Sequence, residues 1–221
     1  MFDTIMFWLD WFGVAVFATT GALMASRKQM DLVGFIVLGT VTGIGGGSIR
    51  DALLGNFPVF WIGDPRYLFT CIVVSVATFF FAHVPQSRYA LLMRFDAVGL
   101  AIFSVIGADT ALVVGVDPVV AVAMGVITAT FGGIVRDVLG GESPSVLRRE
   151  VYVTAALLGA ALFVGLTQAG LDRGYGAIAG FSTALVVRLG ALHWHWTLPR
   201  YRPRPSGPRD HAAGKEEDSD L

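Results

Sequence analysis

Charged side chains are scarce in this sequence. Lys and Arg number 16 and Asp and Glu number 17 among 221 residues, so that 15% of the chain is charged and the net charge is −1. Soluble domains average about 25% charged residues, and ten of the charged residues here follow Pro199. The remainder cannot cover a water-facing surface, which excludes a soluble globular enzyme. The near-neutral balance also excludes an electrostatic nucleic-acid binder.

Cysteine and histidine are also scarce. Cys71 is the single Cys and lies in an apolar run, and the chain has 4 His. This inventory excludes an intramolecular disulfide and offers no Cys/His set for a metal. The apolar stretches hold no Ser/His/Asp arrangement, paired Glu residues or His-rich set. We therefore expect no enzyme activity, no metal site and no resident cofactor.

Apolar residues, by contrast, make up 54% of the chain and gather in long stretches. Stretches able to cross a hydrocarbon core of about 30 Å as helices lie at roughly 6–26, 31–55, 66–84, 91–112, 117–140, 149–168 and 174–192. We therefore predict an all-α integral membrane protein with seven transmembrane helices.

Basic residues beside these spans collect on one side, and Lys and Arg near span ends are retained in the cytoplasm. With the N-terminus outside, the cytoplasmic set is Arg27, Lys28, Arg88, Arg94, Arg148, Arg149, Arg188 and the basic residues of the tail, whereas Arg66 and Arg173 lie outside. The predicted orientation is N-out/C-in in a bacterial inner membrane. Residues 200–221, rich in Pro, Gly and mixed charge, are predicted to be a disordered cytoplasmic tail.

The run His193-Trp194-His195-Trp196 closes the last span. Two His so close together allow a metal or proton-relay interpretation. Aromatic residues, however, concentrate where a span leaves the membrane. We interpret this run as part of an interfacial aromatic belt.

The first part of the chain repeats in the second at an offset of 86 residues. Without a gap, this shift superposes Asp10 on Asp96, Gly46 and Gly47 on Gly132 and Gly133, and Arg50-Asp51 on Arg136-Asp137. Each copy holds three spans, and an odd number makes the second copy cross in the opposite sense. We predict inverted three-helix repeats at 5–84 and 91–169, with a seventh helix at 174–192.

Glycine clusters lie in the middle of the second and fifth spans. They are Gly45-Gly46-Gly47 and Gly132-Gly133, and an Arg-Asp pair follows each at the same spacing. Gly weakens a helix by about 1 kcal/mol per residue relative to Ala, so these clusters favour helix breaks whose freed carbonyls could coordinate a cation. The alternative is close packing of helices on small residues. The doubled Arg-Asp pattern favours the breaks.

Arg50 and Arg136 lie within the predicted membrane region, where a charge costs at least about 2.5–3.5 kcal/mol. Sequence neighbours do not face each other on a helix, so Asp51 and Asp137 are not expected to neutralise them. We predict that Arg50 pairs with Asp10, and Arg136 with its repeat equivalent Asp96. Snorkelling of both Arg side chains to lipid headgroups is the alternative.

Hydroxyl side chains flank the glycine clusters and would add to a polar path with the freed carbonyls. They are Thr42, Ser48, Thr128 and Thr130. Each could equally donate a hydrogen bond back to its own helix. Both interpretations stay open.

The segments GIGGGSIRDALLGNFP and FGGIVRDVLGGESPSVLRREVY resemble the paired motifs of prokaryotic trimeric intracellular cation (TRIC) channels, a family also labelled as glycine transporters. The resemblance covers about residues 5–192. It implies a homotrimer with one pore per subunit, lined by the second and fifth spans and permeable to monovalent cations, chiefly potassium. The matching motif positions are Gly45, Gly46, Gly47, Arg50, Asp51, Gly132, Gly133, Arg136 and Asp137. Phe131 of the second copy stands at the position that Gly45 has in the first copy, and it could form a hydrophobic constriction.

Two functions therefore follow from the sequence. The first is a homotrimeric, potassium-permeable channel whose partners are its own copies, membrane lipids and monovalent cations. The second is a secondary transporter of a small zwitterion such as glycine, because inverted repeats with broken helices are typical of transporters.

Overall fold

The computed structural model describes residues 2–82, 88–147 and 151–197, and the regular elements in these ranges are helices. The prediction of an all-α protein is confirmed. The helices are α1 (Phe2–Arg27), α2 (Leu32–Leu54), α3 (Phe60–Gly63), α4 (Arg66–Phe81), α5 (Arg88–Val114), α6 (Pro118–Leu139), the 3-10 turn η1 (Ser145–Leu147), α7 (Val153–Gln168) and α8 (Arg173–Trp194). The predicted tail at 200–221, and Arg148 and Arg149, lie outside the described residues.

Each predicted span coincides with one helix, to within about four residues at either end. Among the described residues, five helices are long and apolar enough to cross a membrane: α1, α2, α5, α6 and α8. α4 and α7 are apolar but have 16 residues each, which is about 24 Å of helix. The protein is therefore a membrane protein with several spans, and a total of seven crossings stays a prediction.

Acidic residues start three of the long helices. Asp31, Asp117 and Asp172 cap α2, α6 and α8, and each carboxylate accepts a hydrogen bond from a first-turn backbone N–H. Such caps satisfy one of the free N–H groups that every helix start leaves. Asp31 and Asp117 are also equivalent under the 86-residue offset. Local sequence therefore sets both starts in the same way.

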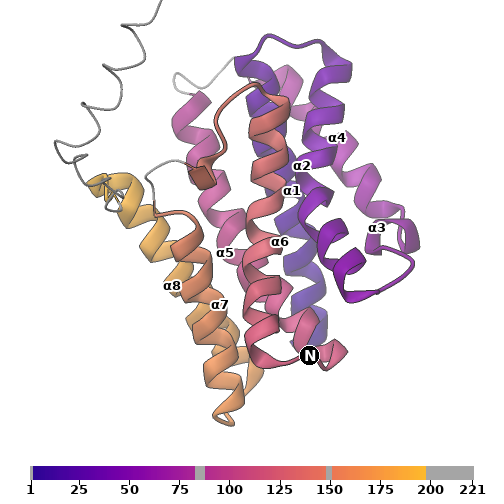
Figure 1. Cartoon of the computed structure of the whole chain (residues 1–221). Helices are drawn as coiled ribbons and strands as arrows, with labels where there is room; N and C mark the ends of the chain where they lie inside the picture. The colour runs from indigo at the N-terminus through magenta and orange to yellow at the C-terminus, as the bar shows by residue number, and fades with distance from the viewer. Residues whose placement is uncertain (1, 83–87, 148–150, 198–221) are drawn as a thin grey trace, which may run out of the picture.

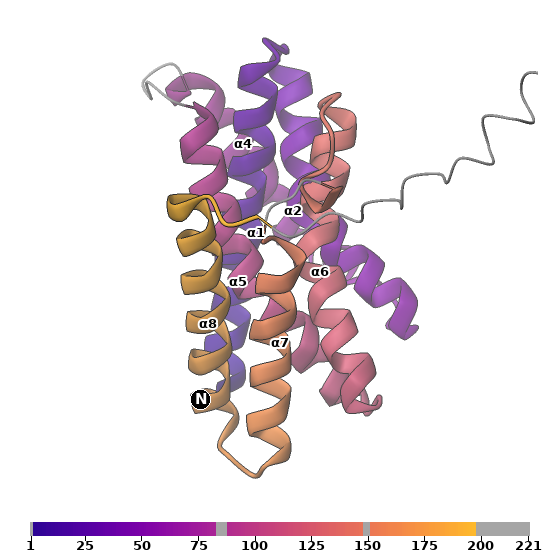
Figure 2. The same ribbon diagram turned by 60° about the vertical axis from the view of Figure 1, so that its left-hand side comes forward.

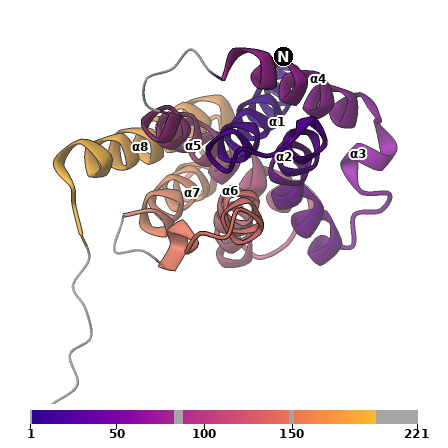
Figure 3. The ribbon, with the colours of Figure 1, turned by 90° about the horizontal axis from the view of Figure 1, so that it is seen from above.

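α5 lies at the centre of the bundle, between α1, α6, α7 and α8 (Figures 1 and 3). α7 and α8 lie side by side at one edge (Figure 2), and α3 and α4 cover α2 and α1 at the other. The outward faces carry large exposed apolar side chains, among them Phe69, Phe81, Val119 and Val186. A soluble monomer rarely exposes so much apolar surface, and such faces are typical of a membrane protein.

The contact between α1 and α5 is reciprocal. Phe17 packs where a Cβ on Gly99 would lie, and Phe103 packs at the corresponding place beside Gly13. The two phenyl rings meet with their centroids 5.1 Å apart. Because Gly13 and Phe17 are the 86-residue equivalents of Gly99 and Phe103, the same contact is made twice with the roles of the helices exchanged.

Candidate functional site

The glycine clusters lie in uninterrupted helices. α2 is helical from Leu32 to Leu54 and α6 from Pro118 to Leu139, so the predicted helix breaks at Gly45-Gly46-Gly47 and Gly132-Gly133 are wrong. The glycines instead allow the two helices to cross at very short range. This is the packing alternative that the sequence left open.

The α2–α6 crossing is again reciprocal. A Cβ on Gly46 would overlap the carbonyl oxygen of Thr128, and a Cβ on Gly132 would lie 2.5 Å from the carbonyl oxygen of Thr42. Distances this short are not tolerated between a methyl group and a backbone oxygen, so Gly is required at both positions. Gly45 differs, because its Cβ would meet only the Cα of Gly132 at 3.9 Å.

The four hydroxyls near the crossing bond to their own helices. Each donates to the carbonyl oxygen four residues earlier, at 2.5 Å for Thr42, 2.7 Å for Ser48, 2.6 Å for Thr128 and 2.8 Å for Thr130. The three Thr residues are buried by protein. In this conformation they do not line an open lumen, which favours the back-bonding alternative. A polar path along them in an open channel stays a prediction. Phe131 is only partly buried, and its role as a constriction stays a prediction.

A group of buried charges, which we call the second charge cluster, joins Asp96, Arg136, Asp137 and Tyr152. Arg136 Nη1 lies 2.6 Å from Asp96 Oδ1, and Arg136 Nη2 lies 2.8 Å from Asp137 Oδ1. Nη1 also donates to Thr20 Oγ1 at 3.1 Å. The predicted Arg136–Asp96 pair is thus confirmed. Since Arg136 and Asp96 are 0% exposed, their charges compensate each other within the protein.

Asp137 takes part because the chain after α6 fixes its carboxylate. Asp137 Oδ2 accepts hydrogen bonds from the backbone N–H of Ser145 at 2.8 Å and from Ser145 Oγ at 2.9 Å. The long Arg136 side chain then folds back so that Nε reaches Asp137 Oδ1 at 2.9 Å. The expectation that sequence neighbours cannot pair is wrong, because it considered the helix surface and not a guanidinium at the end of a flexible side chain.

The first charge cluster consists of the repeat equivalents Asp10, Arg50 and Asp51, together with Tyr67. Arg50 Nε donates to Asp51 Oδ1 at 2.8 Å, and Asp51 Oδ2 accepts from the backbone N–H of Phe60 at 2.9 Å. The predicted Arg50–Asp10 ion pair is not formed between these two described residues. Asp10 instead interacts electrostatically with Tyr67 and Arg50.

Sequence reasoning missed Arg188 as a buried residue and counted it among the cytoplasmic markers. Arg188 is 0% exposed, its guanidinium lies 4.9 Å from the centroid of the Tyr152 ring, and Nη1 donates to the carbonyl oxygen of Val151 at 3.5 Å. The side chain lies against Val151 and Tyr152, just before α7, and its place among the cytoplasmic markers stays a prediction. A charge inside the predicted span 174–192 was the available signal.

This geometry can be compared with known proteins. The sequence model of the glycine transporter family matches residues 7–83 and 93–168. A crystal structure of the TRIC trimeric intracellular cation channel orthologue from Rhodobacter sphaeroides has a TM-score of 0.86 and 58% identity, over 87% of this chain and 100% of that chain. The chain belongs to the TRIC channel family.

Curated relatives of this TRIC family member include membrane proteins of bacteria. The UPF0126 membrane protein of Vibrio cholerae is 42% identical over 90% of this chain and 83% of its own length. The UPF0126 inner membrane protein YadS of Escherichia coli K12 is 41% identical over 89% of this chain and 96% of its own length. The residues that the family model matches include both glycine clusters and both charge clusters.

At the end of α1, this TRIC family member carries an ion-pair group outside the membrane spans. Arg27 Nη2 lies 3.0 Å and Lys28 Nζ 3.3 Å from Glu142 Oε1, which joins α1 to the chain after α6. Partial burial alone would raise the pKa of Glu142. The hydrogen bonds and charges of Lys28 and Arg27 outweigh burial and hold this pKa below its ordinary value of 4.5.

We expect Glu142→Gln to lower the free energy of unfolding by no more than about 1 kcal/mol at pH 7, since the group is partly solvated. A lowered pKa in the folded state stabilises the protein above about pH 4.5, and this contribution is lost as the pH falls through the folded pKa. Melting curves of wild type and variant should therefore differ at pH 7 and converge in acid. A difference that grows on acidification would contradict this account.

Proposed function

We propose that this protein is a homotrimeric cation channel of a bacterial inner membrane, permeable to potassium, with one pore per subunit between α2 and α6. The observation that carries this proposal is the 58% identity and TM-score of 0.86 to the Rhodobacter sphaeroides TRIC channel orthologue. A likeness this close over 87% of the chain favours a shared activity and points away from an enzyme. The name of the Escherichia coli relative supports the inner membrane.

The charge clusters suit a cation path. On α1, Asp10 belongs to the first charge cluster and Thr20 contacts Arg136 of the second, about 15 Å apart along the helix axis. Phe17 lies between them on α1 and next to Gly132 at the α2–α6 crossing, so one cluster lies on either side of the crossing. Each buried Arg of α2 and α6 has an Asp partner. The first charge cluster holds two carboxylates, Asp10 and Asp51, for the one guanidinium of Arg50. Compensation of this kind removes the positive barrier that an unpaired Arg would set against cations.

The reciprocal contacts support an inverted repeat, 5–84 on 91–169. With it, the proposal includes seven crossings and the N-out/C-in orientation that the positions of Lys and Arg predict. Phe17 contacts Gly99 as Phe103 contacts Gly13. Likewise, Gly46 contacts Thr128 as Gly132 contacts Thr42. Contacts that recur with exchanged roles are what a twofold axis in the membrane plane produces. On this proposal the axis passes through the α2–α6 crossing, and backbone contact at Gly46 closes the path. Conduction then requires the two helices to move apart.

Reconstitution into a planar bilayer tests the channel. We expect discrete single-channel openings in symmetric KCl, and a reversal potential that follows the potassium gradient and not the chloride gradient. A reversal potential that follows chloride would contradict the compensated-arginine argument. Crosslinking in native membranes should reach a trimer, and products that stop at the monomer would contradict the oligomeric state.

A transporter of a small zwitterion remains the second candidate because the matching family model is described as a glycine transporter. Its structural support is weaker than the sequence indicated, since α2 and α6 are uninterrupted and present no half-helix ends near the crossing. Saturable glycine uptake by proteoliposomes that show no openings would favour the transporter over the channel.

A further inference from the structure

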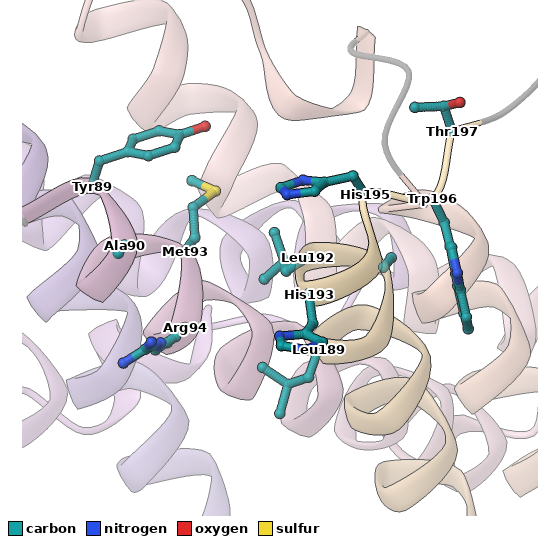
Figure 4. A pocket seen from close by; sticks show the side chains of 11 residues that line it. Tyr89, Ala90, Met93, Arg94, Leu189, Leu192, His193, His195, Trp196 and Thr197 are labelled. Atoms are coloured by element: carbon teal, nitrogen blue, oxygen red, sulfur yellow. The ribbon is translucent and has the colours of Figure 1, made fainter.

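A second feature of the molecule lies away from the α2–α6 crossing. A surface pocket of about 650 Å³ opens between the start of α5 and the end of α8. Figure 4 shows Tyr89, Met93 and Arg94 of α5 on one side of it, and His193 and His195 on the other. Neither the repeat nor the charge clusters account for this pocket.

The pocket has the charge of an anion site. Arg94 is exposed, lines the pocket and makes no ion pair with the described residues. His193 and His195 add hydrogen-bonding imidazoles, and no carboxylate is found among the described residues that line it. A guanidinium binds phosphate oxygens well because its N–H groups form a planar fork.

The pocket also lies at the depth of lipid headgroups. Trp194 and Trp196, at the end of α8, are exposed and stack with their ring centroids 5.6 Å apart. Exposed Trp residues at the end of a span mark the membrane interface. Apolar side chains, Met93, Leu189 and Leu192, lie among the polar groups of the lining (Figure 4). A pocket that combines one cationic and two imidazole side chains with apolar ones complements an amphiphile better than it complements a soluble anion.

We propose that this pocket binds an anionic phospholipid, with the phosphate at Arg94, His193 and His195 and an acyl chain along Leu189 and Leu192. The volume of the pocket falls in the range of small-ligand sites. A second copy of the chain is a poorer occupant, because a cationic cavity requires an acidic protrusion to fill it. The proposal does not depend on channel activity.

Native mass spectrometry of the purified full chain tests the site, with phosphatidylglycerol or phosphatidylcholine added to the detergent. One basic side chain near a membrane surface contributes about 1 kcal/mol toward an anionic lipid, or about fivefold in affinity. We expect wild type to retain phosphatidylglycerol at least about fivefold better than phosphatidylcholine. Arg94→Gln combined with His193→Gln and His195→Gln should abolish the preference. Arg66→Gln is the matched control, since Arg66 is an exposed Arg that pairs with Asp64 away from the pocket.

Four results would overturn the proposal. Equal retention of the two lipids by wild type would show no anion site, and this measurement does not depend on any variant folding. A preference that survives the triple variant would place the lipid elsewhere. Displacement of phosphatidylglycerol by an equal concentration of glycerol 3-phosphate would identify a site for soluble phosphates. Loss of trimers in the triple variant with unchanged lipid retention would assign the pocket to a subunit contact, and would likewise overturn it.

Discussion

Asp96→Asn is expected to lower the free energy of unfolding by about 3 kcal/mol, because it leaves Arg136 with part of its charge uncompensated in the protein interior. Arg136 Nη1 and Asp96 Oδ1 are 2.6 Å apart and both side chains are 0% exposed, so water cannot replace the lost carboxylate. For a domain of this size the loss corresponds to a melting temperature lower by about 6–12 °C. Thermal unfolding of the detergent-solubilised protein, followed by size-exclusion chromatography, measures the shift.

The repeat supplies a matched control for this variant. Asp10 is the 86-residue equivalent of Asp96, but it is only partly buried and makes no ion pair with Arg50. Asp10→Asn should therefore lower the free energy of unfolding by less than about 1 kcal/mol. The double variant Arg136→Gln/Asp96→Asn should lower the free energy of unfolding by less than the sum of the losses in the two single variants. Each single variant leaves one member of the pair without its partner, whereas the double variant removes both. Equal shifts for Asp10→Asn and Asp96→Asn would contradict the assignment of Arg136–Asp96 as the dominant buried pair.

The helices of this protein could be predicted because each depends on a long, continuous signal. About twenty apolar residues in a row specify a membrane helix wherever they pack, and the caps Asp31 and Asp117 set two starts locally. The Arg136–Asp96 pair could be predicted for another reason. A buried Arg requires a partner, and the repeat register left few carboxylates near it.

The partner of Arg50 could not be predicted from the same reasoning. Its choice of Asp51 over Asp10 depends on the backbone N–H of Phe60, which holds Asp51 in place from the chain after α2. That contact is made by tertiary structure and has no counterpart in residue spacing. Arg188 shows the same limit, because its burial depends on where Tyr152 enters the bundle.

Glycine clusters are ambiguous in sequence for a physical reason. Gly weakens a helix and also allows another backbone to approach, so a break and a close crossing use the same residues. The distinction depends on what occupies the space where a side chain would lie. For Gly46 that space holds the carbonyl oxygen of Thr128. Packing of α2 against α6 at this point then offsets the low helix propensity of the glycines in α2.

Gly46→Ala is expected to destabilise the protein by about 2–3 kcal/mol, since the added methyl group forces α2 and α6 apart. Because the atom in its way is a backbone oxygen, no side-chain rotation can relieve the overlap. If contact at this crossing closes the conduction path, the same variant should also raise the open probability of single channels. Thermal unfolding and bilayer recording measure the two effects separately.

Gly45→Ala is the control because it adds the same methyl group one residue earlier, where the nearest atom would be the Cα of Gly132 at 3.9 Å. Replacing Gly by Ala in an open helical position stabilises a helix by up to about 1 kcal/mol, so this variant should be as stable as wild type or more so. The two neighbouring substitutions are therefore expected to change stability in opposite directions. Gly132→Ala should reproduce the effect of Gly46→Ala from the other helix.

If Gly46→Ala and Gly45→Ala behave alike, the close crossing does not exist in the membrane. If Gly46→Ala destabilises the protein but leaves the open probability unchanged, the crossing is tight but is not the barrier to conduction.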